Sequence, residues 1–161
     1  MLPQKTQPAL LPTLRLASPE DAEAIRALTR SAYAKWVPVI GREPMPMQAD
    51  YAQAVRSHRF DLLYSDGDLK ALIETIPHPD HLFVENVAVA PEAQGRGYGR
   101  LLLDHAEGVA RSLRLLEMRL LTNRAFASNV QLYLRCGYTI DREEPFKEGF
   151  TVYMSKRLGS S

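Results

Sequence analysis

Hydrophobic and polar positions follow two spacings along this chain, and each spacing predicts a different element. Buried positions of a helix recur every three to four residues, whereas a half-buried strand alternates at every second residue. The spacings predict, in order, a strand at Leu14–Leu16; a helix from Ser18 to about Tyr33; a helix from Ala49 to about His58; strands at Phe60–Tyr64, Leu69–Ile76 and His81–Ala90; a helix from Gly97 to about Arg114; a strand at Met118–Thr122; a helix at Ser128–Arg135; and closing strands at Tyr138–Ile140 and Phe150–Met154. This order predicts a mixed α/β fold, because strands and helices do not alternate strictly.

The ends of these elements carry residues with special backbone preferences. Ser18 followed by Pro19 is typical of a helix start. The Asp66–Gly67 pair is a hairpin turn signal, and Pro91 ends the strand before it. Gly137 is a helix C-cap.

Two segments show no regular pattern. Residues 35–47 contain three prolines and a glycine together with Trp36, so no long regular element fits there. An apolar loop of this kind is either a wall of a functional site or a cover over a core edge, and the sequence leaves both open. The stretch from Arg142 to Gly149 is polar, which predicts a loop between the closing strands. It carries the acidic residues Glu143, Glu144 and Glu148, which are either near a cationic substrate or simply solvated.

Composition narrows the class of protein. The chain has 161 residues, 45% of them hydrophobic and 24% charged, so we expect one folded domain at 13–158 with short tails at 1–12 and 159–161. Its formal charge of +1 creates no strong field for nucleic acid or anionic lipid, and we expect neither as a partner. The single cysteine, Cys136, excludes an intramolecular disulfide framework. No apolar run reaches the ~20 residues of a membrane span, and a cytoplasmic location is expected.

One stretch carries recognisable chemistry, the glycine-rich segment between the strand that ends near Val89 and the next helix. It reads Gln94-Gly95-Arg96-Gly97-Tyr98-Gly99-Arg100. Glycines at alternate positions let successive backbone N–H groups turn toward one side, and the helix N-terminus adds a partial positive charge. Arg96 and Arg100 add further charge, so the segment predicts a pyrophosphate site. The alternative is a loop that needs positive φ only for tight turning.

Spacing separates the known phosphate motifs. A P-loop ends in Gly-Lys-Ser/Thr, but this glycine run ends in Gly99-Arg100. The dinucleotide fingerprint GxGxxG needs its last glycine one position later and its first directly after the strand. The pattern that fits is Gln-x-x-Gly-x-Gly, and a nucleotide-binding domain is therefore disfavoured.

The pattern Gln-x-x-Gly-x-Gly, with Asn86-Val87-Ala88-Val89-x-Pro before it, resembles the acetyl-CoA-binding motif of the GCN5-related N-acetyltransferase (GNAT) family. Downstream, the segment 132–138, Leu-Tyr-Leu-Arg-Cys-Gly-Tyr, resembles a second signature of that family. The resemblance implies a single-domain GNAT-like fold, with a mixed, mostly antiparallel sheet of about six to seven strands and about four flanking helices. It also implies direct acetyl transfer from acetyl-CoA to an amine, without a covalent acyl-enzyme.

The family resemblance assigns roles to residues. Around the cofactor it implies Val87, Ala88, Val89, Gln94, Gly95, Arg96, Gly97, Tyr98, Gly99 and Arg100. The N–H of Val87 or a neighbour is a suitable donor to the thioester oxygen. Tyr133 matches the tyrosine that protonates the leaving sulfur; its alternative is a packed core tyrosine. Glu85 is the preferred general base, acting through water, with Glu74 in reserve; its alternative is a solvent-facing carboxylate.

The sequence departs from the family pattern at one position. Many relatives have an asparagine seven residues before the tyrosine, where this chain has Phe126. Asn129 is the better replacement for the lost cofactor contact, and Asn123 is the other.

On the acceptor side, Tyr33, Trp36 and Arg42 resemble a stretch that borders the acceptor pocket in a bacterial branch of the family. Aromatic side chains there suit an aliphatic amine, and Arg42 suits a substrate carboxylate; their alternative is a lid packed on the sheet edge. We expect a small-molecule primary amine as acceptor, no metal, and a possible homodimer by analogy. The rival function is a catalytically silent acyl-CoA-binding module, which needs the glycine segment but neither Glu85 nor Tyr133.

Overall fold

A seven-stranded sheet with the order β1-β2-β3-β4-β5-β7-β6 forms the centre of the protein. The computed structural model describes residues 11–159; of the tails expected at 1–12 and 159–161, residues 1–10 and 160–161 lie outside this range. The strands are β1 (Thr13–Leu16), β2 (Arg59–Ser65), β3 (Asp68–Pro77), β4 (Leu82–Val89), β5 (Glu117–Asn123), β6 (Thr139–Phe146) and β7 (Gly149–Arg157). All neighbours pair antiparallel except β4 and β5, which pair parallel. This is the mixed, mostly antiparallel sheet that the family resemblance implies.

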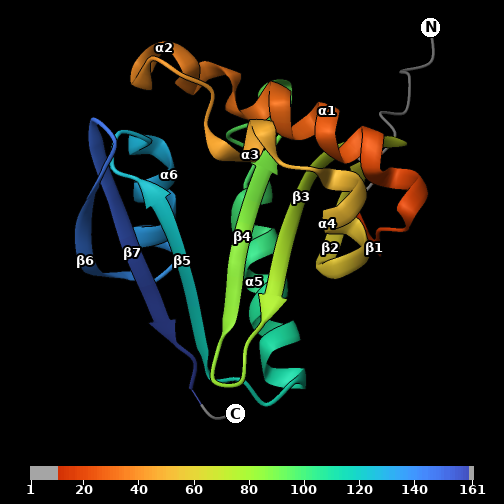
Figure 1. Cartoon of the computed structure of the whole chain (residues 1–161). Coiled ribbons are helices and arrows are strands. Elements are labelled where there is room, and N and C mark those ends of the chain that lie inside the picture. The colour runs from red at the N-terminus through yellow and green to blue at the C-terminus, as the bar shows by residue number, and fades with distance from the viewer. Residues whose placement is uncertain (1–10, 160–161) are drawn as a thin grey trace, which may run out of the picture.

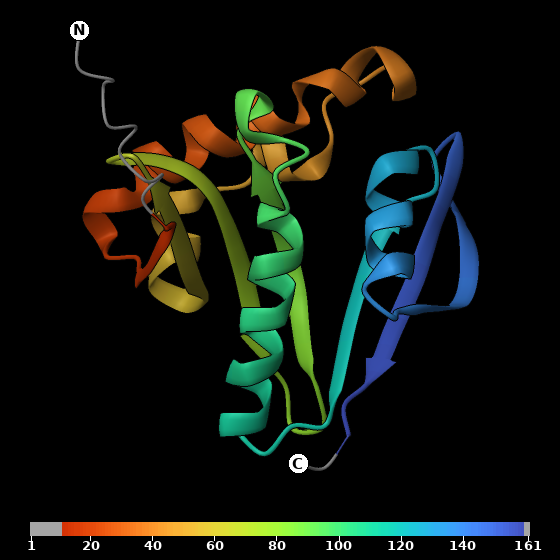
Figure 2. The ribbon, with the colours of Figure 1, turned by 180° about the vertical axis from the view of Figure 1, so that it is seen from behind.

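Helices cover both faces of the sheet, as Figures 1 and 2 show. They are α1 (Ala22–Tyr33), α2 (Val37–Ile40), α3 (Met45–Gln48), α4 (Tyr51–Ser57), α5 (Tyr98–Ser112) and α6 (Ala127–Arg135), with short 3-10 turns η1 (Pro19–Asp21), η2 (Ala34–Trp36) and η3 (Pro91–Ala93). The helices α1 to α4 lie on the front face in Figure 1, and α5 and α6 lie behind. The fold is therefore a single GNAT-like domain with three layers.

Alternation along the strands divides the core between the two faces. Ala71 and Ile73 of β3 pack toward α5, while Leu72 packs with Ile25 and Leu28 of α1. Successive strand residues point to opposite faces, so each strand of this part contributes to both cores. This double burial explains why β3 and β4 are apolar over most of their length.

A β-bulge interrupts this alternation in β4. Thr75 of β3 pairs with Val84, but Glu74 pairs with Asn86, so Glu85 is the extra residue of the bulge. Before the bulge Val84 faces the α5 side, and after it Ala88 packs with the α1 side. The bulge therefore directs Glu85 and Asn86, two consecutive residues, toward the same cavity on the front face.

The strands β4 and β5 diverge soon after they meet. Their parallel pairing is confined to Leu82–Val84 against Met118–Leu120. Beyond these pairs the two strands splay into a V (Figures 1 and 2). The backbone of β4 after the bulge consequently has no neighbouring strand on its β5 side.

The element order matches the sequence prediction, but two segments differ in detail. The irregular stretch 35–47 contains the very short helices α2 and α3. The loop predicted at 142–149 is wrong, because β6 continues to Phe146 and β7 begins at Gly149. Every residue of β6 is exposed, as expected for an edge strand. An edge strand with both faces in solvent shows no apolar alternation, and this hid it in the sequence.

The ammonium group of Lys156 on β7 connects the two back helices. It forms an ion pair with the mostly buried Glu107 of α5 and donates a hydrogen bond to the carbonyl oxygen of Cys136 at 2.7 Å, at the end of α6. We expect Lys156→Met to lower the free energy of unfolding by about 2 kcal/mol, because the Glu107 carboxylate loses its partner. Urea unfolding at pH 7 measures this. Arg26→Gln, which removes an exposed ion pair with Glu23, is expected to change stability by less than about 0.5 kcal/mol; equal losses would contradict the assignment.

Candidate functional site

A cavity of about 860 Å³ occupies the splay between β4 and β5. Its walls come from α1, α3, α4 and the segments around them, from β3, β4 and β5, from α6 and from the β6–β7 hairpin. The polar and aromatic side chains among its lining residues include Tyr33, Arg42, Asp50, Tyr51, His58, Glu74, Glu85, Asn86, Asn123, Phe126, Tyr133, Phe146 and Tyr153. The divergence of two strands thus brings residues from most of the chain to one place.

The backbone of β4 forms one edge of this cavity. Ala90 donates its N–H to the carbonyl oxygen of Lys70 at 2.8 Å, which fixes the alternation of hydrogen bonds between β3 and β4. Counting back along β4, the N–H and C=O groups of Val87 and Val89 point away from β3. The Val87 carbonyl accepts a hydrogen bond from the Tyr33 hydroxyl at 3.3 Å. The N–H groups of Val87 and Val89 face the gap that β5 has left. Ala88 between them is buried in the front core.

The three glycines of the glycine segment have two different structural roles. Gly95 and Gly97 have φ of 84° and 83°, in the left-handed region, where glycine has no Cβ penalty. Gly99 lies inside α5 and has no positive φ; a Cβ there would meet Leu132 Cδ2 of α6 at 3.0 Å. Only the first two glycines turn the backbone, in contrast to the expectation for all three. The third allows α6 to approach α5.

The N-terminus of α5 is open to a ligand. No side chain caps the helix at Gly97, and the first intrahelical hydrogen bond runs from Leu101 N to Gly97 O. The N–H groups of residues 98–100 therefore remain as donors. Arg96 and Arg100 are exposed beside them, while the half-buried Tyr98 packs on both cores. This arrangement suits a phosphate group.

Gln94 links the glycine segment to its neighbours. Its Nε2 donates a hydrogen bond to the Val89 carbonyl at 3.2 Å, and its Oε1 accepts one from Lys35 Nζ at 2.9 Å. Through its side chain, Gln94 holds the start of the glycine segment against the end of β4. The Gln94 side chain lies between the two backbone stretches that face the ligand, which explains why the motif has a glutamine at this position.

Two carboxylates and an imidazole lie on the acceptor side of the cavity. Glu74 is buried, and its Oε2 lies 2.6 Å from Nδ1 of His58. Burial raises the pKa of the Glu74 carboxyl above its ordinary value; the hydrogen bond with His58 opposes this rise, and the charge of Glu85 adds to it. Glu85 itself is exposed to the cavity. The preferred and the reserve base of the sequence analysis therefore lie close together.

Tyr133 lies on the other side of the gap, in α6. Its side chain is buried in the back core, with its ring 6.0 Å from that of Tyr138, and it lines the cavity. Burial raises the pKa of the Tyr133 phenol well above its ordinary value. The phenol keeps its proton at neutral pH, as an ordinary tyrosine also does, so it has a proton to donate.

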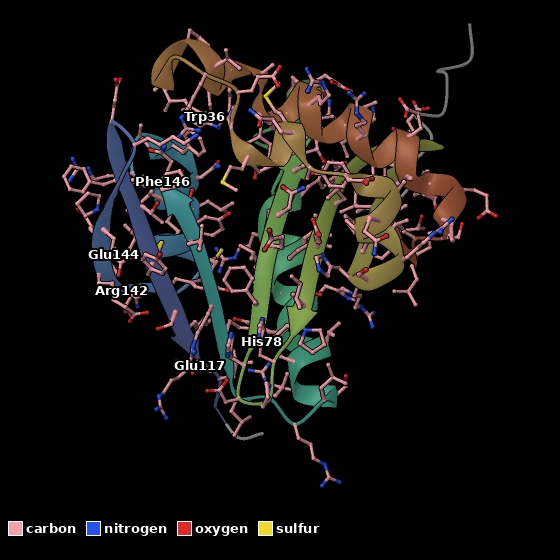
Figure 3. All side chains as sticks on the ribbon, viewed as in Figure 1. Trp36, His78, Glu117, Arg142, Glu144 and Phe146 are labelled. Atoms are coloured by element: carbon pink, nitrogen blue, oxygen red, sulfur yellow. The ribbon has the colours of Figure 1, made fainter. Side chains whose placement is uncertain are left out.

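Phe126 occupies the position where the family pattern has asparagine, and it is buried between two aromatic rings. It stacks on Trp36 with centroids 4.9 Å apart and meets Tyr33 edge-on at 6.4 Å. Trp36 does not line the cavity itself but supports Phe126, which does. Trp36 and Phe146 both lie at the open end of the V, as Figure 3 shows.

The two asparagines near Phe126 have different surroundings. Asn123 Oδ1 accepts a hydrogen bond from the N–H of Ala125 at 2.9 Å, which shapes the turn from β5 into α6. Asn129 is half-buried in the first turn of α6 and is not among the cavity-lining residues. Asn123 is therefore the asparagine at the cavity wall.

Arg42 reaches the cavity from the segment between α2 and α3. Its guanidinium lies 5.7 Å from the centre of the Phe146 ring, at the end of β6. This cation–π contact joins the two walls of the cavity mouth. None of the ion pairs among residues 11–159 involves Arg42, so its charge is available to a ligand.

Sequence reasoning missed His58, Tyr51, Phe146 and Tyr153 as cavity residues. His58 ends α4 without any local motif, so only the fold shows that it contacts Glu74. The alternation of side chains along β7 indicates that Tyr153 faces the cavity only once the pairing register of β7 with β5 and β6 is known.

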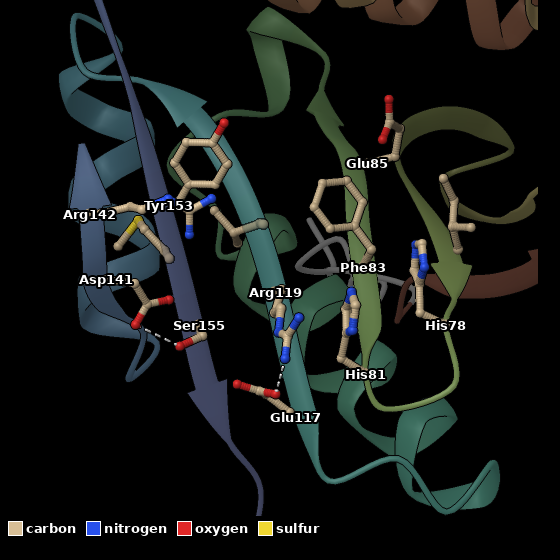
Figure 4. A pocket seen from close by; sticks show the side chains of 13 residues that line it. His78, His81, Phe83, Glu85, Glu117, Arg119, Asp141, Arg142, Tyr153 and Ser155 are labelled. Carbon is tan, nitrogen blue, oxygen red and sulfur yellow. Dashed lines mark hydrogen bonds and ion pairs between the residues drawn. The ribbon is translucent and has the colours of Figure 1, made fainter. Parts of the chain in front are cut away.

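A second hollow of about 710 Å³ lies on the same face toward the closed end of the V. Figure 4 shows Phe83 and Glu85 of β4 and Tyr153 of β7 pointing into it. At its rim the rings of His78 and His81 stack with centroids 4.5 Å apart. Among residues 11–159, no group of three or more His, Cys, Asp or Glu side chains is placed to hold a metal ion. In the same part of the chain, none of the helices has the length and hydropathy of a membrane span.

Comparisons with known proteins agree with this geometry. The fold is similar to that of the PaiA N-acetyltransferase from Thermoplasma acidophilum in complex with coenzyme A, with a TM-score of 0.80, 19% identity, and coverage of 92% of this chain and 100% of that chain. It is also similar to the ribosomal-protein-S18-alanine N-acetyltransferase from Escherichia coli (TM-score 0.76, 19% identity, coverage 94% and 96%). A third is nourseothricin acetyltransferase (TM-score 0.72, 24% identity, coverage 92% and 99%).

Sequence comparison gives the family. A search of curated protein sequences finds no match. The model of the acetyltransferase (GNAT) family, however, matches residues 23–138, which include β4, the glycine segment, the splay and α6. The chain therefore belongs to the GNAT acetyltransferase family.

Proposed function

We propose that this protein transfers an acetyl group from acetyl-CoA to the primary amine of a small molecule. The observation that carries the proposal is the cavity of about 860 Å³ in the splay. It brings the backbone of Val87, the protonated phenol of Tyr133 and the carboxylate of Glu85 to one space. These are the three groups that acetyl transfer to an amine needs: a donor to the carbonyl oxygen, an acid for the sulfur and a base for the amine.

The residues present fit CoA. The uncapped N–H groups of 98–100, with Arg96 and Arg100 beside them, suit its pyrophosphate. The Val87 and Val89 edge of β4 suits an extended arm that hydrogen-bonds like a strand. When bound, acetyl-CoA supplies the acetyl group as a thioester. The N–H of Val87 then donates to the carbonyl oxygen, which gains negative charge during the transfer.

The amine must lose its proton before it can attack. A primary ammonium with pKa near 10 is only about one part in a thousand neutral at pH 7, which corresponds to about 4 kcal/mol. Glu85, directed into the cavity by the bulge, attracts the ammonium and accepts its proton. Tyr133 provides the phenolic proton for the leaving sulfur on the other side of the gap.

The mouth of the cavity favours a small acceptor. Arg42 and Phe146 meet across it, so the two walls that would have to admit a protein segment are in contact. The structural neighbours do not decide the size of the acceptor, because one is named for a ribosomal protein and another for nourseothricin. Arg42 is the cation that would pair with a carboxylate on the acceptor, at a distance from its amine.

Ligand-induced stabilisation tests the cofactor. Acetyl-CoA or CoA at 100 times its Kd is expected to stabilise the protein by about 2.7 kcal/mol, a shift of several degrees in Tm, whereas NAD and ATP at the same excess are not. Gly97→Ala is expected to reduce the CoA shift, because it distorts the α5 N-terminus at φ 83°. Gly67→Ala has the same backbone strain, φ 82°, in the β2–β3 turn, and should keep the shift. A shift lost in both variants, or no shift with CoA in the parent protein, would contradict the proposal.

Removal of the Tyr133 hydroxyl tests the acid. With an amine found by screening for CoA release, Tyr133→Phe is expected to lower kcat about 100-fold, while the Tm shift with CoA stays as in the parent. Tyr138→Phe is the matched control and should keep kcat, because the Tyr138 hydroxyl is also buried and has no hydrogen-bond partner among residues 11–159. Unchanged kcat in both Tyr133→Phe and Glu85→Gln would show that the roles assigned to these two residues are wrong, whereas CoA binding without CoA release from any amine would favour a silent CoA-binding module.

The charge of Arg42 sets the preference among amines. Arg42→Ala is expected to raise KM about tenfold for amines that carry a carboxylate, because it removes a charge-assisted hydrogen bond. The KM of alkylamines without a carboxylate should change less than twofold. Steady-state kinetics with an amino acid and its decarboxylated amine as paired acceptors measures the difference. An equal change for both members of the pair would show that Arg42 acts only through packing on Phe146.

A further inference from the structure

A buried histidine–carboxylate pair faces the acceptor side of the cavity. His58 follows α4 as its C-cap, with its N–H bonded to the carbonyl oxygen of Ala54. Its Nδ1 lies 2.6 Å from Oε2 of Glu74 on β3, and the side-chain exposures are 29% for His58 and 4% for Glu74. Both residues line the cavity together with Glu85. The imidazole is therefore oriented by a fixed partner and remains open to the cavity.

The pairing decides which nitrogen of the imidazole is free. A carboxylate only accepts hydrogen bonds, so Nδ1 of His58 is the protonated nitrogen that donates to Glu74. Nε2 then has a lone pair. The lone pair of Nε2 can accept a proton, and the Glu74 carboxylate then faces the positive charge of the imidazolium that forms.

The charged and titratable groups around this pair come from every neighbouring element. They are Glu85 of β4, Asp50 before α4, Tyr51 of α4 and Tyr33 of α1. Burial raises the pKa of both tyrosines, so they are neutral. Asp50 accepts a hydrogen bond from the N–H of Gln53 at the start of α4. No cationic side chain other than His58 itself and Arg42 lines the cavity among residues 11–159.

The protein contains a second pair of similar construction outside the cavity. His105 of α5 lies 3.1 Å from Asp61 of β2, with exposures of 33% and 5%. Asp61 is also held by Arg59, and neither His105 nor Asp61 lines the cavity. A half-exposed histidine on a buried carboxylate thus occurs twice, once at the acceptor site and once away from it.

We propose that His58 is a further proton acceptor of the reaction and that Glu74 is its positioning residue. The inference rests on the proposed function. The proton leaves the ammonium nitrogen for Glu85, passes to Nε2 of His58, and leaves for solvent from the exposed side of the imidazole. Glu74 stabilises the imidazolium until then. The amine thereby gains its free electron pair for attack, and Glu85 returns to its charged form.

The tautomer of His58 tests the His58–Glu74 pairing in the absence of an acceptor amine. In the ¹⁵N-labelled full chain at pH 8, the imidazole nitrogen signals are expected to show His58 protonated at Nδ1 and unprotonated at Nε2. Glu74→Gln is expected to weaken this preference, because an amide also offers an N–H donor to Nδ1. Protonation of Nε2 instead of Nδ1 in the parent protein would overturn the proposal.

The pH profile tests the catalytic role. His58→Gln is expected to lower kcat about 100-fold with little change in KM. It should also remove the acid limb of the kcat profile, because a glutamine side chain has no imidazole to protonate. Glu74→Gln should move that limb to lower pH, since the imidazolium loses its stabilising charge. The matched control His105→Gln should leave kcat and the profile unchanged. The Tm shift with CoA reports whether each variant is folded.

The outcomes separate the two proposals. If the parent protein acetylates an amine and His58→Gln, shown to be folded, keeps its kcat and its acid limb, the role of His58 is wrong and the proposed function stands. If the parent protein releases no CoA with any amine of a panel of polyamines, amino acids and arylalkylamines, the proposed function fails, and the role of His58 fails with it.

Discussion

The divergence of β4 from β5 beyond Val84 is the constraint on which the rest of the site depends. Two parallel strands that stayed paired would use the N–H and C=O groups of Val87 and Val89 on each other. Because they separate, the N–H groups of Val87 and Val89 face the gap instead of β5, while the two carbonyl groups accept hydrogen bonds from Tyr33 and Gln94. Backbone donors left in this way are available to a ligand. The glycine segment and α5 follow directly from the open end of β4. The acetyl donor site is thus built from backbone, with few side chains.

The bulge at Glu85 places residues of the acceptor side of the cavity on the same strand, β4. Without the extra residue, alternation would place Asn86 on the α5 face and bury it under the helix. With it, Glu85 and Asn86 share the front face, and Asn86 accepts a hydrogen bond from the Tyr33 hydroxyl at 3.0 Å. Glu74 on the neighbouring strand then meets both Glu85 and His58. One inserted residue therefore places the proton-accepting groups, Glu85 and the His58–Glu74 pair, beside the backbone that would bind the thioester.

The sequence predicts the element order well because most strands here are buried and the longer helices α1 and α5 each have an apolar, buried face. It identifies the glycine segment and Tyr133 because local motifs mark them. It misses most of β6, whose fully exposed edge position leaves no alternation to detect. His58 is also missed, since its contact with Glu74 depends on the position of α4 against β3. Trp36 and Phe126 are a third case. Their aromatic side chains indicate a wall of the site, but only the structure shows that Phe126 lines the cavity and that Trp36 stacks on it.

The central claim is that the open edge of β4 and the uncapped start of α5 bind acetyl-CoA. Amide-resolved hydrogen exchange with and without acetyl-CoA tests this most directly, since each N–H reports its own protection. The account predicts slower exchange on binding at Val87, Val89 and residues 98–100, and little change at the amides of β6. Binding that leaves the exchange of these five amides unchanged, or that protects only other parts of the chain, would contradict it.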